Sequence, residues 1–84
     1  MNDVQLRTLL INTLSKYAKN KEVLTDAKDD VDLRNDLKIQ SARLVDVVLD
    51  LEVELDIEIE PDDMDKMFSI GETMEMLKKY LPKT

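Results

Sequence analysis

The feature that most constrains the fold is the periodicity of residues 41–55, SARLVDVVLDLEVEL, in which apolar side chains recur every three or four positions. At about 100° per residue in a helix, one set of them falls within roughly 60° and lines a single face. This set is Leu44, Val48, Leu51 and Leu55. A stripe of this width is typical of an amphipathic helix that packs on a core. The segment therefore predicts a helix with one buried face.

The scarcity of turn residues extends this prediction to the rest of the chain. Among 84 residues there are one glycine, two prolines and no tryptophan, whereas sheet sandwiches need frequent turn signals. We therefore expect an all-α fold. A chain of this length can bury only one modest core, so residues 1–84 are expected to form a single domain.

Two further segments also have helical periodicity. Residues 3–19 carry apolar side chains at three- and four-residue steps, with Asn2 or Asp3 placed to cap the helix. Their apolar positions are Leu6, Leu9, Leu10, Leu14 and Tyr17. Farther along, Ser69 and Glu72 fit a capping box for a last helix that Pro82 ends. The residues expected to face inward from this helix are Ile70, Thr73, Met74, Leu77, Tyr80 and Leu81.

The connections between these helices differ in length. Residues 20–40 have no sustained period and are rich in aspartate, which predicts a long, ordered loop. Four apolar residues are expected to hold this loop on the core: Val31, Leu33, Leu37 and Ile39. Residues 56–60 predict an extended connection, and Pro61 suits the first turn of a short helix over residues 62–68. The methionines of the chain are interpreted as flexible core filler.

The residue types that are missing exclude several kinds of chemistry. The sequence has no cysteine and no histidine, so it lacks disulfides, thiolate zinc ligands and the commonest general base. We therefore do not expect an enzyme, and we assign no catalytic or metal-binding residues. The acidic run DAKDDVDLRNDL also lacks the mid-loop glycine of an EF-hand calcium site.

The charge balance indicates the kind of partner. Lys and Arg number 12 against 19 Asp and Glu, for a net charge of -7, which argues against nucleic acid and anionic membranes and favours basic protein surfaces. The N-terminal stretch MNDVQLRTLL lacks the basic region and apolar core of a signal peptide, and no apolar run approaches the length of a membrane span. We expect a cytoplasmic protein without membrane insertion.

Residues 41–55 also carry a second apolar stripe, centred about 140° from the first in helical projection. Its members are Ala42, Val45, Leu49 and Val53. Asp46 and Asp50 border this stripe on one side and Glu52 borders it on the other. An apolar strip rimmed by carboxylates predicts a docking surface. The alternative is that these acids merely form a solvated helix face.

Ser41, at the start of the same segment, has two interpretations. Serine is a preferred helix N-cap, because its hydroxyl can accept a hydrogen bond from a free N–H of the first turn. A serine at that place is also exposed enough for a modifying enzyme to reach, and a helix N-terminus favours a phosphate ester. The local pattern leaves both interpretations open.

The organisation of the chain from about residue 4 to residue 81 resembles the acyl carrier protein family. The specific part of the resemblance is Leu33-x-x-Asp36-Leu37-x-x-x-Ser41, followed by a helix and then by Asp56-Ile57-Glu58-Ile59. In the family, a large apolar residue precedes Asp-Leu-Gly-x-Asp-Ser-Leu, and an acidic helix leads into a similar Asp-Ile-Glu-Ile segment. The spacing from Ser41 to Asp56 matches without a gap.

The resemblance implies a four-helix bundle with three longer helices, one short helix and a long first loop. It implies that a phosphopantetheinyl transferase attaches 4′-phosphopantetheine to Ser41, and that a monomeric carrier presents acyl thioesters to enzymes of fatty-acid, lipid or polyketide-type biosynthesis. In the family, acids of the helix after the serine meet basic docking patches, and apolar positions make contact beside them. The corresponding acids here are Asp46, Glu52 and Glu54, and the apolar positions are Val45 and Leu49.

The departures from the family pattern surround the serine. Gln40 replaces an acid, Ala42 replaces a leucine, Arg43 replaces an acid, and Lys38 replaces the glycine of the loop. Because charged rims chiefly set partner choice, these changes indicate a specialised carrier with dedicated enzymes. The alternative hypothesis is an unmodified, acidic helical interaction module in which Ser41 serves only as a helix N-cap.

Overall fold

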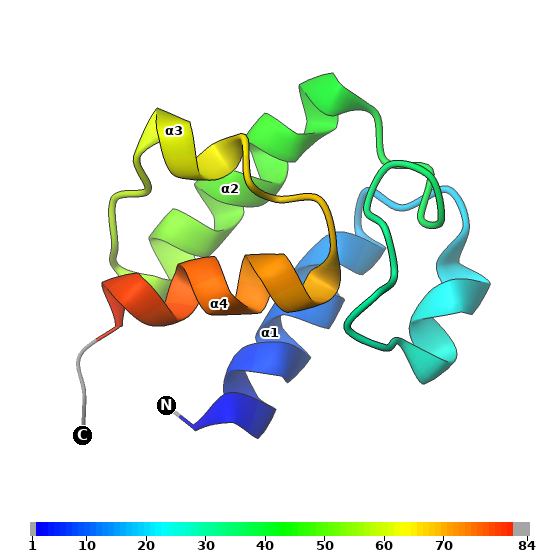
Figure 1. Ribbon diagram of the computed structural model, residues 1–84, viewed down its shortest axis with the longest axis horizontal. Coiled ribbons are helices and arrows are strands. Elements are labelled where there is room, and N and C mark those ends of the chain that lie inside the picture. The colour runs from blue at the N-terminus through cyan, green and yellow to red at the C-terminus, as the bar shows by residue number, and fades with distance from the viewer. Residues whose placement is uncertain (1, 82–84) are drawn as a thin grey trace.

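Residues 2–81, the part of the chain that the computed structural model describes, form an all-α fold (Figure 1). The elements in chain order are α1 (Asp3–Ser15), the 3₁₀-helix η1 (Lys21–Asp26), α2 (Ser41–Leu55), α3 (Pro61–Met64) and α4 (Ile70–Tyr80). The predicted set of three longer α-helices and one short α-helix is confirmed. Within the described residues, sheet-like pairing is limited to one isolated antiparallel bridge, between Asp32 and Ser69.

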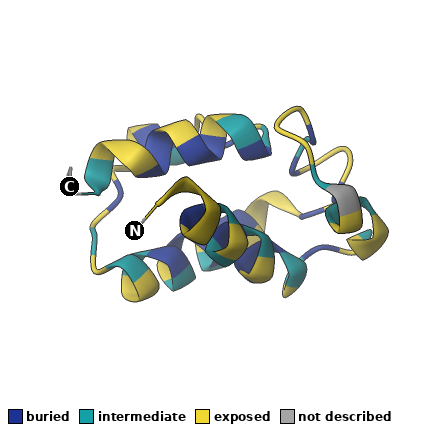
Figure 2. Cartoon of the chain, turned by 90° about the horizontal axis from the view of Figure 1, so that it is seen from below, coloured by how far each residue is buried: buried dark blue, intermediate teal, exposed yellow. Residues whose placement is uncertain are grey.

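One apolar core joins all of these segments. Helix α1 packs against both α2 and α4, and Figure 2 shows the buried positions of the helices turned toward the interior. The fully buried leucines Leu6, Leu10 and Leu14 line the inner side of α1. The predicted inner faces of α2 and α4 are buried too, except that Leu55, Tyr80 and Leu81 are only partly covered. Val47 is buried as well, although it was not predicted to face the core.

Helix α1 begins as the sequence predicts and ends earlier. Asn2 is the N-cap, and it forms a capping box in which its side chain accepts from the Gln5 N–H at 2.8 Å. The prediction that the helix continues to residue 19 is wrong, because it ends at Ser15. The N–H groups of Lys19 and Asn20 bond instead to the carbonyl of Leu37, at 3.1 and 3.2 Å. The chain therefore leaves the helix to pair with the loop that precedes α2.

The long first loop is ordered, as expected, and it contains one element that was not predicted. Residues 21–26 form the 3₁₀-helix η1, which packs against α1. All four apolar residues that were expected to hold the loop on the core are buried. The loop also pairs with the start of α4, where the Gly71 N–H donates to the Asp29 carbonyl at 2.9 Å. A Cβ on Gly71 would lie 2.9 Å from the Cβ of Asp29, so this close approach requires glycine.

The short helix and the last helix follow the predicted signals. Pro61 opens α3, but α3 ends at Met64 instead of residue 68, and Phe68 lies in the following loop with 47% of its surface exposed. Ser69 caps α4 by accepting from the Glu72 N–H at 3.2 Å. The Glu72 carboxylate accepts from the Ser69 hydroxyl instead of its backbone N–H, so only one of the two bonds of the predicted capping box is formed. Met67, Met74 and Met76 are buried, which agrees with their interpretation as core filler. The predicted stop at Pro82 lies outside the described residues.

Candidate functional site

Ser41 is the first residue of α2, and its side chain is exposed. Gln40 is the N-cap, with an extended backbone at φ −68° and ψ 146°, and its carbonyl accepts from the N–H groups of Arg43 and Leu44. The prediction that Ser41 is the N-cap is therefore wrong. A cap side chain belongs to the residue before the first turn and accepts from an N–H two or three residues farther on, whereas Ser41 is already inside that turn. No side chain forms a capping hydrogen bond at this helix start.

The hydroxyl of Ser41 consequently has no structural task in the described part of the chain. It forms no hydrogen bond with any residue from 2 to 81, and the N–H groups of Ser41 and Ala42 have no backbone acceptor there. Free N–H groups and the helix dipole at this end of α2 favour a negatively charged group. An ester of phosphate on the Ser41 oxygen would sit in that environment.

The segment just before Ser41 is held by two buried side chains. Leu37 and Ile39 are both in the core, and the Ile39 N–H donates to the Leu33 carbonyl at 3.0 Å. Lys38, between them, is exposed and adopts the left-handed conformation with φ 59°. This conformation favours glycine, and Lys38 occupies the position at which the acyl carrier pattern has its loop glycine. The backbone thus keeps a glycine-like turn ahead of Ser41 although the glycine is replaced.

The second apolar stripe of α2 is exposed, as the helical projection predicts. Val45 is 46% exposed, Leu49 is 53% exposed and Val53 is 80% exposed. Ala42, at the serine end, is exposed as well. On the opposite side of the helix, Leu44 and Leu51 are buried. The stripe is therefore not a misplaced part of the core.

The acids predicted to bind a partner protein differ in whether their carboxylates already form hydrogen bonds or ion pairs within the chain. Asp46 pairs with Arg43 at 2.9 Å, and Asp50 accepts a hydrogen bond from the Tyr17 hydroxyl at 2.7 Å. Lys16 also lies 3.6 Å from the carboxylate of Asp50.

The two acids nearer the end of α2 differ as well. Glu52 accepts from the Ile59 N–H at 2.8 Å, which fixes the chain after the helix. Glu54 is exposed and has no ion-pair partner among residues 2–81. Thus, of the four acids predicted to bind a partner, Glu54 has a carboxylate that forms no ion pair or hydrogen bond within the described chain.

An open hollow that sequence reasoning missed continues the stripe beyond the end of α2. Its volume is about 810 Å³, and it lies where the chain reverses at Asp56, which has the left-handed conformation with φ 54°. Leu49 and Val53 belong to both the stripe and the hollow. The remaining lining comes from Glu52, Asp56, Ile57, Glu58, Ile59, Glu60 and Pro61. The sequence does show acids at alternate positions in residues 56–62. It does not show that the chain reverses at Asp56 and so brings these acids beside the stripe.

The sequence also did not predict the cluster of charged and hydrogen-bonding side chains around Asp63, which is buried in α3. Lys79 donates to its carboxylate at 2.8 Å, the Tyr80 hydroxyl donates to it as well, and Lys66 lies 3.6 Å away. The hydrogen bond from Lys79, followed by that from Tyr80, lowers the pKa of Asp63 to about 2. The Tyr80 oxygen also accepts from the Glu60 N–H at 3.1 Å. The cluster thus fastens α3 and the connection before it to the end of α4.

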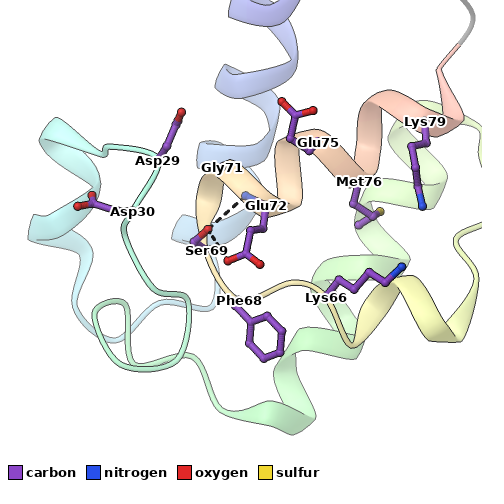
Figure 3. A pocket seen from close by; sticks show the side chains of 10 residues that line it. All are labelled: Asp29, Asp30, Lys66, Phe68, Ser69, Gly71, Glu72, Glu75, Met76 and Lys79. Carbon is purple, nitrogen blue, oxygen red and sulfur yellow. Dashed lines mark hydrogen bonds between the residues drawn. The ribbon is translucent and has the colours of Figure 1, made fainter.

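Another open hollow, of about 760 Å³, lies between the first loop and α4 (Figure 3). Figure 3 shows Glu72 and Glu75 on α4, with the ring of Phe68 and the side chain of Lys66 across from them. Lys66 and Lys79 already face Asp63, and the described residues leave no buried side-chain polar atom without a hydrogen bond. Nothing in this hollow selects a ligand, so Ser41 and the exposed face of α2 form the stronger candidate site.

No helix in the described range combines the length and the apolar character needed to cross a membrane. The sequence was also compared with protein-family models and with curated proteins, and neither comparison gave a match.

Proposed function

We propose that this protein is an acyl carrier, in which the Ser41 oxygen holds a 4′-phosphopantetheine arm whose thiol carries acyl groups as thioesters. The observation that carries the proposal is the state of Ser41. Its hydroxyl is exposed at the N-terminus of α2 and makes no hydrogen bond within residues 2–81. The motif spacing around Ser41 supports the same conclusion.

The attachment needs only a nucleophile from this chain. The Ser41 oxygen would attack the phosphorus of coenzyme A that bears the pantetheine arm, and the bond from that phosphorus to adenosine 3′,5′-bisphosphate would break. The chain has no histidine, so a transferase must supply the base that takes the serine proton. The free N–H groups and dipole of α2 favour the phosphodiester that results.

The exposed stripe supports a carrier role, because a carrier must present its arm to several enzymes in turn. Val45 and Leu49 are available for such contacts, close in sequence to Ser41. The partners would be a phosphopantetheinyl transferase and enzymes that load, extend or unload acyl groups in fatty-acid, lipid or polyketide-type biosynthesis. Gln40, Arg43 and Lys38 change the charge near the serine, which favours dedicated partner enzymes over general ones.

The alternative, an unmodified interaction module, would use the same exposed stripe. This alternative explained Ser41 as a helix cap. That explanation fails, because the N-cap of α2 is Gln40 and no side chain forms a capping hydrogen bond there. Intact mass separates the two functions, since only the carrier acquires a covalent arm.

The test is incubation of the purified protein with coenzyme A and a broad-specificity phosphopantetheinyl transferase. We expect intact mass spectrometry to show one added phosphopantetheinyl group, and we expect Ser41→Ala to abolish the addition. Ser15→Ala is the matched control, because Ser15 bonds to the Asn12 carbonyl within its own helix and should leave labelling unchanged. Labelling that survives Ser41→Ala, or that fails with several transferases, would contradict the proposal.

A further inference from the structure

The serine end of the exposed α2 face carries two exposed cations. Lys38 and Arg43 are exposed on either side of Ser41, and Gln40 between them is neutral. Among the side chains that the structure describes, Lys38 forms no ion pair and Arg43 pairs with Asp46. The loop acids Asp32 and Asp36 accept backbone N–H groups and keep their negative charge. Two exposed cations therefore stand at this end beside acids that partly offset them.

The helix dipole does not explain this charge, although the pair of Arg43 with Asp46 gives the helix some local support. A cation in the first turn of a helix is unfavourable, because it meets the positive end of the helix dipole. Arg43 stands in the first turn of α2, and that turn contains no acid. Its position instead places a guanidinium group beside the serine and beside the apolar stripe.

The opposite end of the same face is acidic. Five exposed carboxylates follow one another along the end of α2, the connection and the start of α3: Glu54, Asp56, Glu58, Glu60 and Asp62. None of them forms an ion pair with another residue of the described chain. Several line the hollow at the end of α2, here called the distal hollow, whose apolar wall includes Leu49, Val53 and Ile57. This end therefore combines free negative charge with an apolar depression.

The two ends of the α2 face are far enough apart to attract or repel a partner independently. Residues 43 and 56 are separated along the helix by roughly 20 Å at 1.5 Å per residue. The screening length in physiological salt is about 8 Å. A uniformly basic partner surface would gain attraction at the distal end and meet repulsion near Ser41.

We propose that this face binds a partner protein surface with the complementary, divided charge. Carboxylates of the partner face Lys38 and Arg43, its Lys or Arg side chains face the acids of residues 54–62, and one of its apolar side chains enters the distal hollow. Such a surface binds in one direction along α2, which brings a fixed part of the partner to Ser41. The identification of the partner as an enzyme acting at Ser41 rests on the proposed function, whereas the charge order does not.

The test uses two synthetic amphipathic helical peptides with the same leucine face as probes. One peptide has lysine at every polar position, and the other has glutamate in one half and lysine in the other. Fluorescence anisotropy with the unmodified protein should show tighter binding of the divided peptide, by about three- to ten-fold at low salt. Added salt should reduce the difference.

Variants test whether the preference for the divided peptide depends on Lys38 and Arg43. Lys38→Glu with Arg43→Glu should reverse the preference in favour of the uniformly basic peptide, and Lys38→Gln with Arg43→Gln should abolish it. The control is Lys21→Glu with Lys28→Glu, which makes the same change in net charge on two residues away from Ser41, the exposed first residue of η1 and a residue just after it, and should keep the preference. Circular dichroism checks that each variant is folded.

Three results would overturn the inference: tighter binding of the uniformly basic peptide to the original protein, a preference that survives the reversal at Lys38 and Arg43, or no binding of either peptide. Each result is independent of whether a transferase labels Ser41. Failure of the divided-charge surface can therefore be distinguished from failure of the carrier function.

Discussion

The hydroxyl of Tyr17 donates a hydrogen bond to a carboxylate oxygen of Asp50 at 2.7 Å, and this contact joins the chain just after α1 to the middle of α2. It changes the interpretation of Asp50. In the sequence, Asp50 borders an exposed stripe and is predicted to bind a partner. In the fold, its carboxylate holds the chain that follows α1 against α2.

We predict that Asp50→Asn lowers the thermal midpoint and leaves enzymatic transfer by a cognate partner nearly unchanged. The hydrogen bond to Asp50 raises the pKa of Tyr17 above its ordinary value of 10.0. Because the folded-state pKa is raised, the stability from this contact is present below pH 10 and is lost as the pH rises through the raised pKa. Ultraviolet titration should show the Tyr17 pKa falling in the variant. A Tyr17 titration that is the same in both proteins would exclude the contact in solution.

The second prediction compares two serines at helix starts. Ser41 makes no capping hydrogen bond, so Ser41→Ala should change the unfolding free energy by no more than about 0.5 kcal/mol. Ser69 is a true cap, with its hydroxyl accepting from the Glu72 N–H, and Ser69→Ala should cost about 1 kcal/mol. Urea unfolding followed by circular dichroism measures both. Equal losses would mean that Ser41 caps α2 in solution.

These two serines also mark what the sequence could and could not predict. The Ser69–Glu72 signal is local, since the cap and the N–H that donates to it lie three residues apart, and it was recognised. The start of α2 depends on the backbone of Gln40, which is set by the burial of Ile39 and by its hydrogen bond to Leu33. Likewise, the stripe at Val45 and Leu49 follows from helical periodicity alone. The contact between Tyr17 and Asp50 spans 33 residues, and no local pattern specifies it.

The third prediction separates docking residues from core residues on α2. Val45→Ala and Leu49→Ala remove exposed side chains, so their thermal midpoints should stay close to that of the original protein while transfer by the cognate enzyme weakens. Leu44→Ala and Leu51→Ala remove buried side chains and should each cost about 2–5 kcal/mol. Thermal melts and one transfer assay suffice. Comparable destabilisation by all four changes would place the stripe in the core.

The fourth prediction concerns the left-handed residue before Ser41. Lys38 has φ 59°, a conformation that a side chain with a Cβ adopts at a cost. Lys38→Gly should therefore stabilise the protein by about 0.5–1 kcal/mol. The opposite change at the close contact with Asp29, Gly71→Ala, should destabilise it, because the new Cβ would meet Asp29. Denaturant midpoints test both signs, and a destabilising Lys38→Gly would show that this turn is different in solution.

The fifth prediction concerns acid stability. Because the pKa of Asp63 is lowered from 3.8 to about 2, its contacts stabilise the fold fully above pH 5 or so and lose their effect as the pH falls toward 2. Asp63→Asn should be less stable at neutral pH and should lose less stability than the original protein between pH 4 and pH 2. Asp65→Asn is the control, since Asp65 is exposed and unpaired within residues 2–81. Parallel acid melting curves for the original protein and Asp63→Asn would contradict the assignment.

The contacts around Asp63 have a consequence for how independent the two ends of the α2 face are. The four-residue helix α3 is too short to be stable alone, and Lys79 and Tyr80 hold it through Asp63 and through the Glu60 N–H. The distal hollow, which Glu60 and Pro61 line, thus takes its shape from the last turn of α4. Ser41, at the far end of α2, follows Leu37 and Ile39, which the first loop buries in the core. Changes in the last turn of α4 and changes in the first loop should therefore alter partner affinity and the presentation of the serine separately.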